Sequence, residues 1–357
     1  MNKYQIVEIA GNFNHAGSKA TADIAQIASN IGFEEIKVRM RSQKDGTIGK
    51  IIRQIGYYID WEECYKKVKN NSVVILQHPF HYNQITRVKT LKKLKNKKKV
   101  KYISVVHDVE ELRAFRYSEY YAEEFEVMLQ LSDVIIVHND VMKRWFISKG
   151  VNEDKLISLE IFDYLQEHVS SKEVGFEKSI TIAGNLDTTK CAYIGQLGEL
   201  KGIKIHLYGP NFDTKMDQFD NVEYHGSFPV NEIPDRLKCG FGLVWDGNSI
   251  DGCKGQSGQY LRYNNPHKLS LYLSSGLPVV IWSKAAEADF VKRNNVGITV
   301  ENLYELPHVL DNMTEEKYRE LAKNAFSLGE NLRIGKYGET ALVKAMEIIE
   351  NKKMGAC

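Results

Sequence analysis

The chain has 357 residues, of which 43% are hydrophobic and 26% charged, and its formal net charge at pH 7 is +2. This length favours two domains over one core, and the composition excludes a disordered chain or a protein that coats nucleic acid through charge alone. The N-terminal segment MNKYQIVEIAG has no long apolar run, and no stretch approaches the roughly 20 apolar residues that a membrane span needs. We therefore expect a cytoplasmic protein.

The cysteines are scattered along the chain and form no Cys-x-x-Cys pair. They are Cys64, Cys191, Cys239, Cys253 and Cys357. Disulfide frameworks and zinc sites are usually recognised by paired spacings, so this distribution favours reduced thiols over either arrangement.

One segment is strongly basic: from Lys89 to Lys101, KTLKKLKNKKKVK contains eight lysines and no acidic residue. Two interpretations stay open. The segment is the solvated end of a helix, or it is a basic patch that attracts the protein to anionic lipid headgroups at the inner face of the cell membrane. Nucleic acid does not fit as a partner, because no aromatic residues alternate with the lysines.

Short β-rich runs alternate with amphipathic helices through the first half of the chain. The runs lie at residues 4–11, 36–40, 72–77, 101–108, 133–139 and 155–162. Helices are predicted between them at residues 18–32, 49–68, 120–132 and 140–150, with one more in the lysine-rich segment. Ala20, Ile24 and Ile27 lie on one face of the first of these helices, and Gly32 ends it.

The alternation resumes after the polar passage QEHVSSKEVGFEK. β-rich runs lie at residues 179–184, 203–209, 222–226, 241–247, 277–282 and 296–300. Helices are predicted from about residue 189, at residues 231–239 and 263–276, and three times near the C-terminus. Parallel βαβ units need such alternation, and burial of their strands on both faces explains the Val/Ile runs.

The sequence therefore predicts an α/β protein with two doubly wound, Rossmann-like domains, at residues 1–165 and 175–330. Residues 331–357 contain the amphipathic segment GETALVKAMEIIE, which we expect to form a helix that crosses back to the first domain. Open α/β sheets bind ligands outside the carboxyl ends of their strands. The cleft between the two domains is therefore the predicted site.

The loop AGNFNHAGSKA follows the first strand. Gly11 and Gly17 permit a close approach of the backbone, and Ser18 can cap the next helix. The loop lacks the Gly-x-Gly-x-x-Gly spacing of a dinucleotide site, so NAD does not fit. His15 either projects into the cleft or is a solvated loop histidine.

His107 and Asp108 end another predicted strand, in VVHDVEELR. A histidine beside a carboxylate at a strand tip can act as a general base, because imidazole titrates near neutrality and a carboxyl pKa responds to its surroundings. The alternative is that Asp108 only caps a helix.

Two loops of the second domain carry groups that suit phosphate. Gly184, Asn185 and Lys190 follow one strand, where backbone N–H groups can form an anion nest and the lysine can meet a phosphate. Asn265 and Lys268 stand at a helix N-terminus, whose unpaired N–H groups and partial positive charge attract anions. Together these elements favour a diphosphate ligand.

Three further strand-end loops begin near Tyr208, Phe228 and Asp246. Phe228 and Pro229 can frame a flat base. No Asp-x-Asp motif occurs, so we expect no divalent metal at the diphosphate; lysines and a helix dipole would stabilise the leaving group instead. A Gly-x-x-x-x-Gly-Lys-Ser/Thr motif is also missing, which disfavours ATP hydrolysis.

Several segments together resemble the bacterial β-1,6-galactofuranosyltransferases and the related glucosyltransferases that extend GlcNAc on serine-rich adhesins. They are AGNFNHAGSKATADIAQIASNIGF, VVHDVEEL, ITIAGN, FGLVWDG and YNNPHKLSLYLSSGLPVVI. The similarity covers nearly the whole chain and is strongest at residues 241–300. The polar insert at residues 247–264 is more similar to the galactofuranosyl branch.

This resemblance implies a GT-B architecture whose second domain binds most of a UDP-sugar. Carried over by motif, the donor-side residues are Gly184, Asn185, Lys190, Tyr208, Phe228, Pro229, Asn265 and Lys268. The residues that would face the acceptor or the anomeric carbon are His15, Gly17, Ser18, His107, Asp108 and Asp246.

The expected reaction is metal-independent transfer of a hexose from a UDP-sugar to a hydroxyl of a glycan or lipid-linked saccharide, in cell-surface polysaccharide or glycoprotein synthesis. Galactofuranose is the favoured sugar and glucose the next. An acceptor hydroxyl attacks the anomeric carbon while Asp108 or His107, with His15 next in line, removes its proton; Lys190 and Lys268 stabilise the departing UDP. We also expect a homo-oligomer.

Three alternatives stay open. A UDP-sugar 2-epimerase shares the architecture and donor but needs acid and base groups on both faces of the sugar. An inactive glycosyltransferase-like subunit that binds a glycan would have lost its phosphate-facing lysines, whereas Lys190 and Lys268 are present. A donor with GDP or dTDP is the third.

Overall fold

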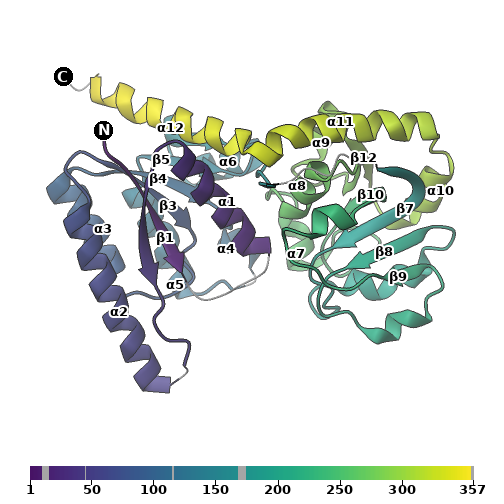
Figure 1. The fold of residues 1–357 in the computed structure, drawn as a ribbon, viewed down its shortest axis with the longest axis horizontal. Coiled ribbons are helices and arrows are strands. Elements are labelled where there is room, and N and C mark those ends of the chain that lie inside the picture. Colours follow the sequence, from purple (N-terminus) through teal and green to yellow (C-terminus); the bar gives the residue numbers. More distant parts are fainter. Residues whose placement is uncertain (10–15, 45, 115, 168–173, 355–357) are drawn as a thin grey trace.

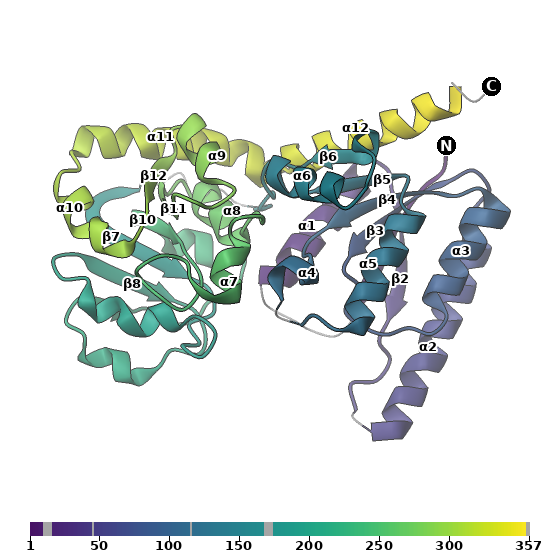
Figure 2. The ribbon, with the colours of Figure 1, turned by 180° about the vertical axis from the view of Figure 1, so that it is seen from behind.

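The structure is a computed structural model that describes residues 1–9, 16–44, 46–114, 116–167 and 174–354, without the side chains of residues 16–18 and 352–354. Its strands form two six-stranded sheets, one from each half of the chain, which lie side by side (Figures 1 and 2). Every strand pair in both sheets is parallel. Among the described helices, none has both the length and the apolar character of a transmembrane segment.

The first sheet has the strand order β2-β1-β3-β4-β5-β6. Its strands are β1 (Lys3–Ile9), β2 (Glu34–Arg39), β3 (Val73–His78), β4 (Lys101–Val106), β5 (Val134–Val137) and β6 (Leu156–Ser158). The helices of this half are α1 (Ala16–Asn30), α2 (Gly46–Lys67), α3 (Arg87–Lys98), α4 (Glu110–Arg113), α5 (Glu119–Leu131), α6 (Asp140–Ser148) and the 3₁₀ helix η1 (Glu153–Lys155). The strand order changes direction between β1 and β3, where sheets of this type bind ligands.

The second sheet has the order β12-β11-β10-β7-β8-β9, so its direction changes between β7 and β10. Its strands are β7 (Gly175–Ala183), β8 (Lys204–Tyr208), β9 (Val222–Tyr224), β10 (Cys239–Val244), β11 (Val279–Trp282) and β12 (Gly297–Val300). The α-helices that accompany it are α7 (Gly255–Tyr260), α8 (His267–Ser274), α9 (Ala288–Arg293), α10 (Leu306–Asp311) and α11 (Glu315–Ile334). The 3₁₀ helices are η2 (Ala192–Glu199), η3 (Thr214–Gln218), η4 (Ile233–Arg236) and η5 (Leu303–Glu305).

Burial on both faces explains the apolar runs of the central strands. Every residue of β5 and of β11 is buried, and these strands read VIIV and VVIW. Helices cover both faces of each sheet, so no face of a central strand meets water (Figures 1 and 2). The prediction of two parallel, doubly wound sheets is confirmed.

Two helices expected in the second half are 3₁₀ helices instead. In η2, Gly195 and Gly198 lower the preference for an α-helix, and Gly198 lies against Phe219, whose ring a Cβ would approach to 2.4 Å. The segment expected at residues 231–239 forms only the four residues of η4, with Pro234 in its first turn. The glycines of η2 and the proline of η4 therefore favour the tighter, shorter 3₁₀ helix over an α-helix.

The last helix, α12 (Lys336–Met354), packs on the first sheet. Its face of Ala341, Leu342 and Ala345 is buried in the core of the first half. α11 ends at Gly335, which has a left-handed φ of 83°, and α12 continues from there across the first half of the chain (Figure 1). The Asp163 carboxylate then accepts hydrogen bonds from the first turn of α12, so a residue of the first half fixes where α12 begins.

Candidate active site

The loops after β7, β8 and β10 meet at the edge where the order of the second sheet reverses. Gly184 follows β7, and Asp246 lies two residues beyond β10. Gly209, after β8, is so close to Gly184 that a Cβ on Gly209 would lie 1.7 Å from the Gly184 carbonyl oxygen. Glycine is therefore required at Gly209, and the two loops pack backbone against backbone.

Lys268 projects from the first turn of α8 to this edge. Its Nζ donates a 2.7 Å hydrogen bond to the main-chain carbonyl oxygen of Trp245, the first residue after β10. One turn later in α8, the Tyr272 hydroxyl accepts a 2.8 Å hydrogen bond from the backbone N–H of Ala183, the last residue of β7. The helix therefore contacts the ends of both strands that flank the reversal.

Asp246 is half-buried beside Lys268. Its Oδ1 accepts hydrogen bonds from the Gly247 backbone N–H at 2.8 Å and from the Cys191 thiol at 3.6 Å. Burial, the first cause, and the Asp246 carboxylate raise the pKa of Cys191 to about 12, so this thiol keeps its proton. The expected acceptor-side role of Asp246 stays a prediction, and the structure places it on the second-domain edge beside Lys268.

Asn185 and Lys190 belong to the exposed loop after β7. The Asn185 Oδ1 accepts hydrogen bonds from the Asp187 backbone N–H and from the Asn211 side chain, at 3.2 and 2.8 Å. The backbone of Lys190 closes a turn on the Asp187 carbonyl oxygen, and its side chain extends from an exposed position. These contacts shape the loop but leave its outer side open to solvent.

Aromatic rings follow the next two strands along the same edge. Tyr208, at the end of β8, stacks on His225, with ring centroids 4.6 Å apart, and lies 6.4 Å from Phe228. The Arg236 guanidinium lies over the Phe228 ring at 4.6 Å. Pro229 is exposed and its carbonyl oxygen accepts the first hydrogen bonds of η4. The structure thus brings most predicted donor residues to consecutive strand ends of β10, β7, β8 and β9.

Asn265 is placed differently from the other predicted donor residues. It is buried at the contact between the two sheets: its backbone N–H donates to His138 Nδ1 at 2.8 Å, and its side chain donates to the Glu160 carbonyl oxygen at 3.1 Å. Both partners belong to the first half of the chain. In this conformation Asn265 joins the domains, and a direct contact with diphosphate stays a prediction.

The predicted loop of the first half is only partly described. His15 lies outside the described residues. Gly17 and Ser18 lie in the first turn of α1, with no description of the Ser18 side chain.

His107 follows β4 and is held as a neutral imidazole. Its ring stacks on Phe162 with centroids 5.4 Å apart, and its Nε2 lies 2.7 Å from the Gln77 Oε1. Burial, helped by neighbouring histidines, lowers the pKa of His107 to about 3. The side-chain oxygen of Gln77, Oε1, can only accept a hydrogen bond, so Nε2 of His107 carries the proton. Nδ1 is then the atom that could accept a proton, and the low pKa makes it a weak base.

Asp108 is a stronger base than His107. Burial raises the pKa of its carboxyl to about 6, although Arg113, which donates a 2.7 Å hydrogen bond to Oδ2, lowers it. Tyr260, from α7 of the second half, also hydrogen-bonds Asp108, while its hydroxyl accepts from the Val109 backbone N–H. The Asp108 side chain is 27% exposed, so a ligand can reach it. A carboxylate with a pKa near 6 suits general base catalysis.

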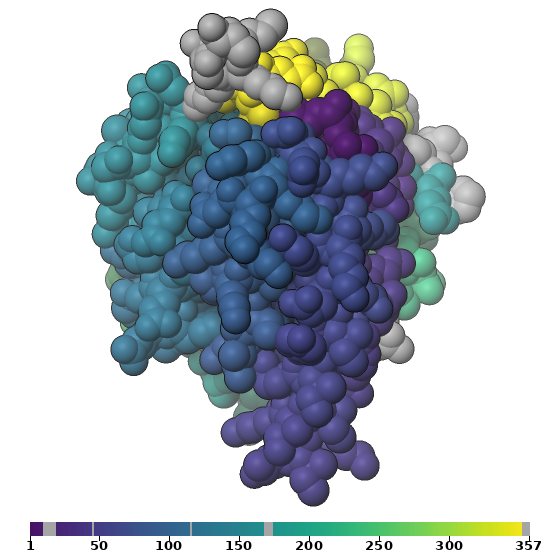
Figure 3. All heavy atoms as spheres, turned by 90° about the vertical axis from the view of Figure 1, so that its left-hand side faces the viewer, coloured from purple at the N-terminus to yellow at the C-terminus, as the bar shows by residue number. Residues whose placement is uncertain are grey.

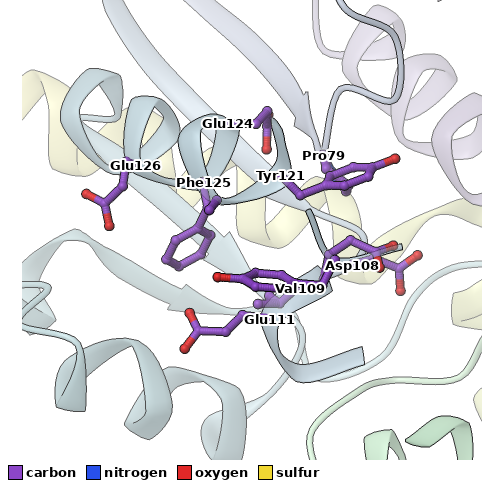
Figure 4. A pocket seen from close by; sticks show the side chains of 11 residues that line it. Pro79, Asp108, Val109, Glu111, Tyr121, Glu124, Phe125 and Glu126 are labelled. Atoms are coloured by element: carbon purple, nitrogen blue, oxygen red, sulfur yellow. The ribbon is translucent and has the colours of Figure 1, made fainter. Parts of the chain in front are cut away.

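Asp108 lines a pocket between α4 and α5, as Figure 4 shows. The pocket is open to solvent and has a cavity volume of about 100 Å³. Its walls combine carboxylates with aromatic rings: they include Glu110, Glu111, Glu124, Tyr117, Tyr121 and Phe125. Carboxylates accept hydrogen bonds from hydroxyls, and rings pack on C–H faces, so the lining suits a sugar.

Sequence reasoning missed a buried polar network at the reversal of the first sheet. Glu8, near the end of β1, accepts a hydrogen bond from Gln84, whose Oε1 accepts a 2.6 Å hydrogen bond from Trp61. Burial raises the pKa of Glu8 to about 7, against the opposite effect of Arg87. The sequence feature that could have indicated this network is Glu8 itself, an acidic residue within the apolar run YQIVEI.

Comparisons with known proteins identify the family. A model of the glucosyltransferase 3-like N-terminal domain matches residues 3–161, and a model of the C-terminal domain of that family matches residues 180–345. The chain belongs to the glucosyltransferase 3-like family. It is therefore a glycosyltransferase enzyme, and its paired Rossmann-like domains are a GT-B fold.

Three similar proteins illustrate this relationship. A β-1,6-galactofuranosyltransferase of Escherichia coli (strain K12) is 32% identical over 94% of this chain and 96% of its own length. Glucosyltransferase 3 of Streptococcus gordonii is 23% identical over 92% of this chain and 94% of its own. The structure of an alpha-glucosyltransferase in complex with UDP superposes with a TM-score of 0.61 at 15% identity, and the match covers 98% and 99% of the two chains.

We expect Asp108→Asn to abolish sugar transfer while donor binding persists, because the amide cannot accept the proton. In the wild type, the raised pKa means that the base form is lost as pH falls through about 6. The kcat/KM should then fall about tenfold per pH unit below 6. Initial rates measured from pH 5 to 8 give the dependence of kcat/KM on pH and test this decrease.

The control for this experiment is Asp154→Asn, at an exposed carboxylate in η1. It should keep the wild-type rate and pH profile. Full activity of Asp108→Asn in a folded protein would exclude Asp108 as the base.

Proposed function

We propose that the chain transfers a hexose from a UDP-sugar to a hydroxyl of a glycan acceptor, with galactofuranose the preferred sugar and glucose the next. The position of Lys268 carries this proposal: its ammonium group is held at the strand-order reversal, in the first turn of α8. The galactofuranosyltransferase relative supports the sugar, and the structural neighbour with bound UDP supports the nucleotide.

The donor diphosphate would lie over the loops after β7 and β10. Lys268 has three N–H donors and uses one on Trp245, so two remain for phosphate oxygens. The N-terminus of α8 adds partial positive charge, and Lys190 extends from the loop after β7. Tyr208 and Phe228 would border the nucleoside.

We propose that transfer requires no divalent metal. The support is the lack of an Asp-x-Asp motif in the sequence, together with the ammonium group at the reversal. A cationic side chain that stabilises the departing UDP can replace a metal ion in this role.

The acceptor would occupy the pocket of Figure 4. Its hydroxyl oxygen attacks the anomeric carbon, the bond from that carbon to the UDP oxygen breaks, and the hydroxyl proton moves to Asp108. The electron pair of the broken bond leaves with UDP, beside Lys268. Asp108 later returns its proton to solvent.

Mass spectrometry of the products tests this function. The protein is incubated separately with UDP-galactofuranose, UDP-glucose, and a GDP- or dTDP-hexose, each with and without a saccharide acceptor. We expect the acceptor to gain one hexose with the UDP-sugars, fastest with UDP-galactofuranose. Epimer formation without acceptor, detected by NMR because epimers have equal masses, would indicate a 2-epimerase, and no product with any donor would contradict the proposal.

We expect Lys268→Ala to weaken UDP binding at least tenfold, which corresponds to about 1.4 kcal/mol, because the diphosphate loses its ammonium partner. Isothermal titration calorimetry with UDP measures the affinity. Lys201→Ala, at an exposed lysine after η2, is the matched control and should bind UDP normally. Equal affinity of the two variants would remove Lys268 from the site.

We also propose that the first half contacts an anionic membrane through α2 and α3. Figure 3 shows α2 projecting from the first half, and one face of it exposes a row of isoleucines. They are Ile48, Ile51, Ile52, Ile55 and Ile59, each between 43% and 76% exposed. The adjacent α3 is held to α2 by hydrogen bonds from Lys98 Nζ to the carbonyl oxygens of Tyr65, in the last turn of α2, and of Val68, the residue after it.

The positive charges of α3 favour an anionic membrane as the partner. Lys89, Lys92, Lys97 and Lys99 are exposed, and no acidic residue lies among them. An apolar helix face enters the headgroup boundary, while neighbouring lysines attract anionic lipid at about 1 kcal/mol each. A lipid-linked acceptor would be presented at the same surface.

Vesicle co-sedimentation tests this contact. We expect binding to phosphatidylglycerol-containing vesicles, little binding to pure phosphatidylcholine, and release by salt. Ile51→Ser with Ile55→Ser should reduce binding more than about tenfold, since each buried isoleucine contributes roughly 1.5 kcal/mol or more.

Ile334→Ser, at the exposed end of α11, is the control and should bind normally. Lipid-independent sedimentation, or a stable oligomer that the double variant dissociates, would contradict the membrane contact.

A further inference from the structure

We propose that Glu177, His206 and Cys239 form a zinc-binding site on the second sheet, separate from the donor edge. Each residue comes from a different strand, β7, β8 and β10. These strands are neighbours in the order β10-β7-β8, so the fold brings together three residues that are far apart in sequence. The spacing of cysteines in the sequence gives no sign of this site.

The distances between the side-chain atoms suit a tetrahedral ion. Glu177 Oε2 lies 3.3 Å from His206 Nε2 and 2.8 Å from Cys239 Sγ, and all three ligand atoms lie within 4.8 Å of one another. Zinc bonds of about 2.0–2.2 Å to nitrogen and oxygen place two tetrahedral ligands roughly 3.3 Å apart. The imidazole and carboxylate therefore already have the required separation, and the thiol lies close enough to join them after a small adjustment of its side chain.

The second nitrogen of His206 has the environment that a metal-bound imidazole requires. Its Nδ1 lies 3.0 Å from His225 Nε2 and 3.6 Å from a carboxylate oxygen of Glu223. Metal-bound histidines usually donate their other N–H to such a partner, which fixes the tautomer and leaves Nε2 free to bind the ion. Glu223 and His225 would therefore support the site from outside it.

A thiol, an imidazole and a carboxylate are a donor set that selects zinc over magnesium or calcium. His206 is 8% exposed, while Glu177 and Cys239 are half-buried. The ion can therefore enter from solvent, and water can complete its coordination. On binding, the Cys239 thiol gives its proton to solvent and its sulfur bonds the ion; no oxidation or reduction occurs.

The ion would stiffen the part of the sheet that leads to the nucleoside loops. His225 contacts His206 on one side and stacks on Tyr208 on the other. A metal that fixes His206 would also fix this chain of rings. The site goes beyond the proposed transfer reaction, because the ion lies among β-strand residues and takes no part in bond breaking.

Cobalt titration of the full chain tests the site. Protein freed of metal by a chelator and dialysed is titrated with Co²⁺ and then with Zn²⁺. We expect a thiolate-to-cobalt charge-transfer band that saturates at one ion per chain and disappears on addition of zinc. Zinc should also raise the Tm of the wild type.

Cys239→Ser should lose the band and the zinc-dependent rise in Tm, although the serine hydroxyl can keep the hydrogen bond to Glu177. Cys191→Ser, at the other half-buried cysteine, should retain both. Glu177→Gln should weaken zinc binding at least tenfold. If Cys239→Ser does not fold, the zinc affinity of Glu177→Gln tests the site instead.

Lack of a band in the wild type, or an equal band in Cys239→Ser, would overturn the proposal. The readout is metal binding rather than sugar transfer, so its outcome does not depend on the donor or the acceptor.

Discussion

The close approach of α8 to β10 determines where the positive charge of the site lies. Gly242 makes this approach feasible: a Cβ there would lie 2.2 Å from the ring of Tyr272, so any other residue would push the helix outward. With the ring seated on the strand, the Tyr272 hydroxyl reaches Ala183 and Lys268 reaches Trp245. The contact between Gly242 and Tyr272 therefore fixes the position of α8 on β10, and with it the position of Lys268. Because the core here is closely packed, the Lys268 ammonium group is held in a defined place.

The contact between the domains contains several hydrogen bonds as well as aromatic packing, and it includes the environment of the candidate base. Asn139 donates to the Tyr263 carbonyl oxygen and to the carboxylate of Glu287, and Tyr260 contacts both Asp108 and Val109. Such hydrogen bonds can be exchanged for water at a lower cost than an apolar interface, so relative movement of domains is expected across them. The pKa of Asp108 depends on burial to which the second half contributes. Separation of the two domains would therefore also change the pKa of Asp108.

Local patterns in the sequence predicted the architecture, because parallel strands buried on both faces and amphipathic helices have distinct periods. The α-helices expected at η2 and η4 were wrong, since glycine and proline inside short helices altered the local preference. Contacts between residues that are far apart in the sequence could not be predicted from such local patterns. Nothing near Tyr260 in the sequence indicates a contact with Asp108, and nothing near Asn265 indicates that it would be buried against His138. A helix was predicted at residues 49–68, but the sequence alone does not tell that its isoleucines form an exposed face.

Burial determines which side chains near Asp108 carry a charge. His107, His138 and His267 surround Phe162, and burial, the main cause in each case, lowers their pKa values to between about 3 and 4. These imidazoles are neutral near pH 7 and add no positive charge near Asp108. The carboxylate of Asp108 therefore keeps its affinity for a proton, while the ammonium group of Lys268 lies at the strand-order reversal of the second sheet. In the proposed transfer, a proton would leave the attacking oxygen and negative charge would develop on the leaving oxygen, so these two fixed charges would stabilise the two that develop.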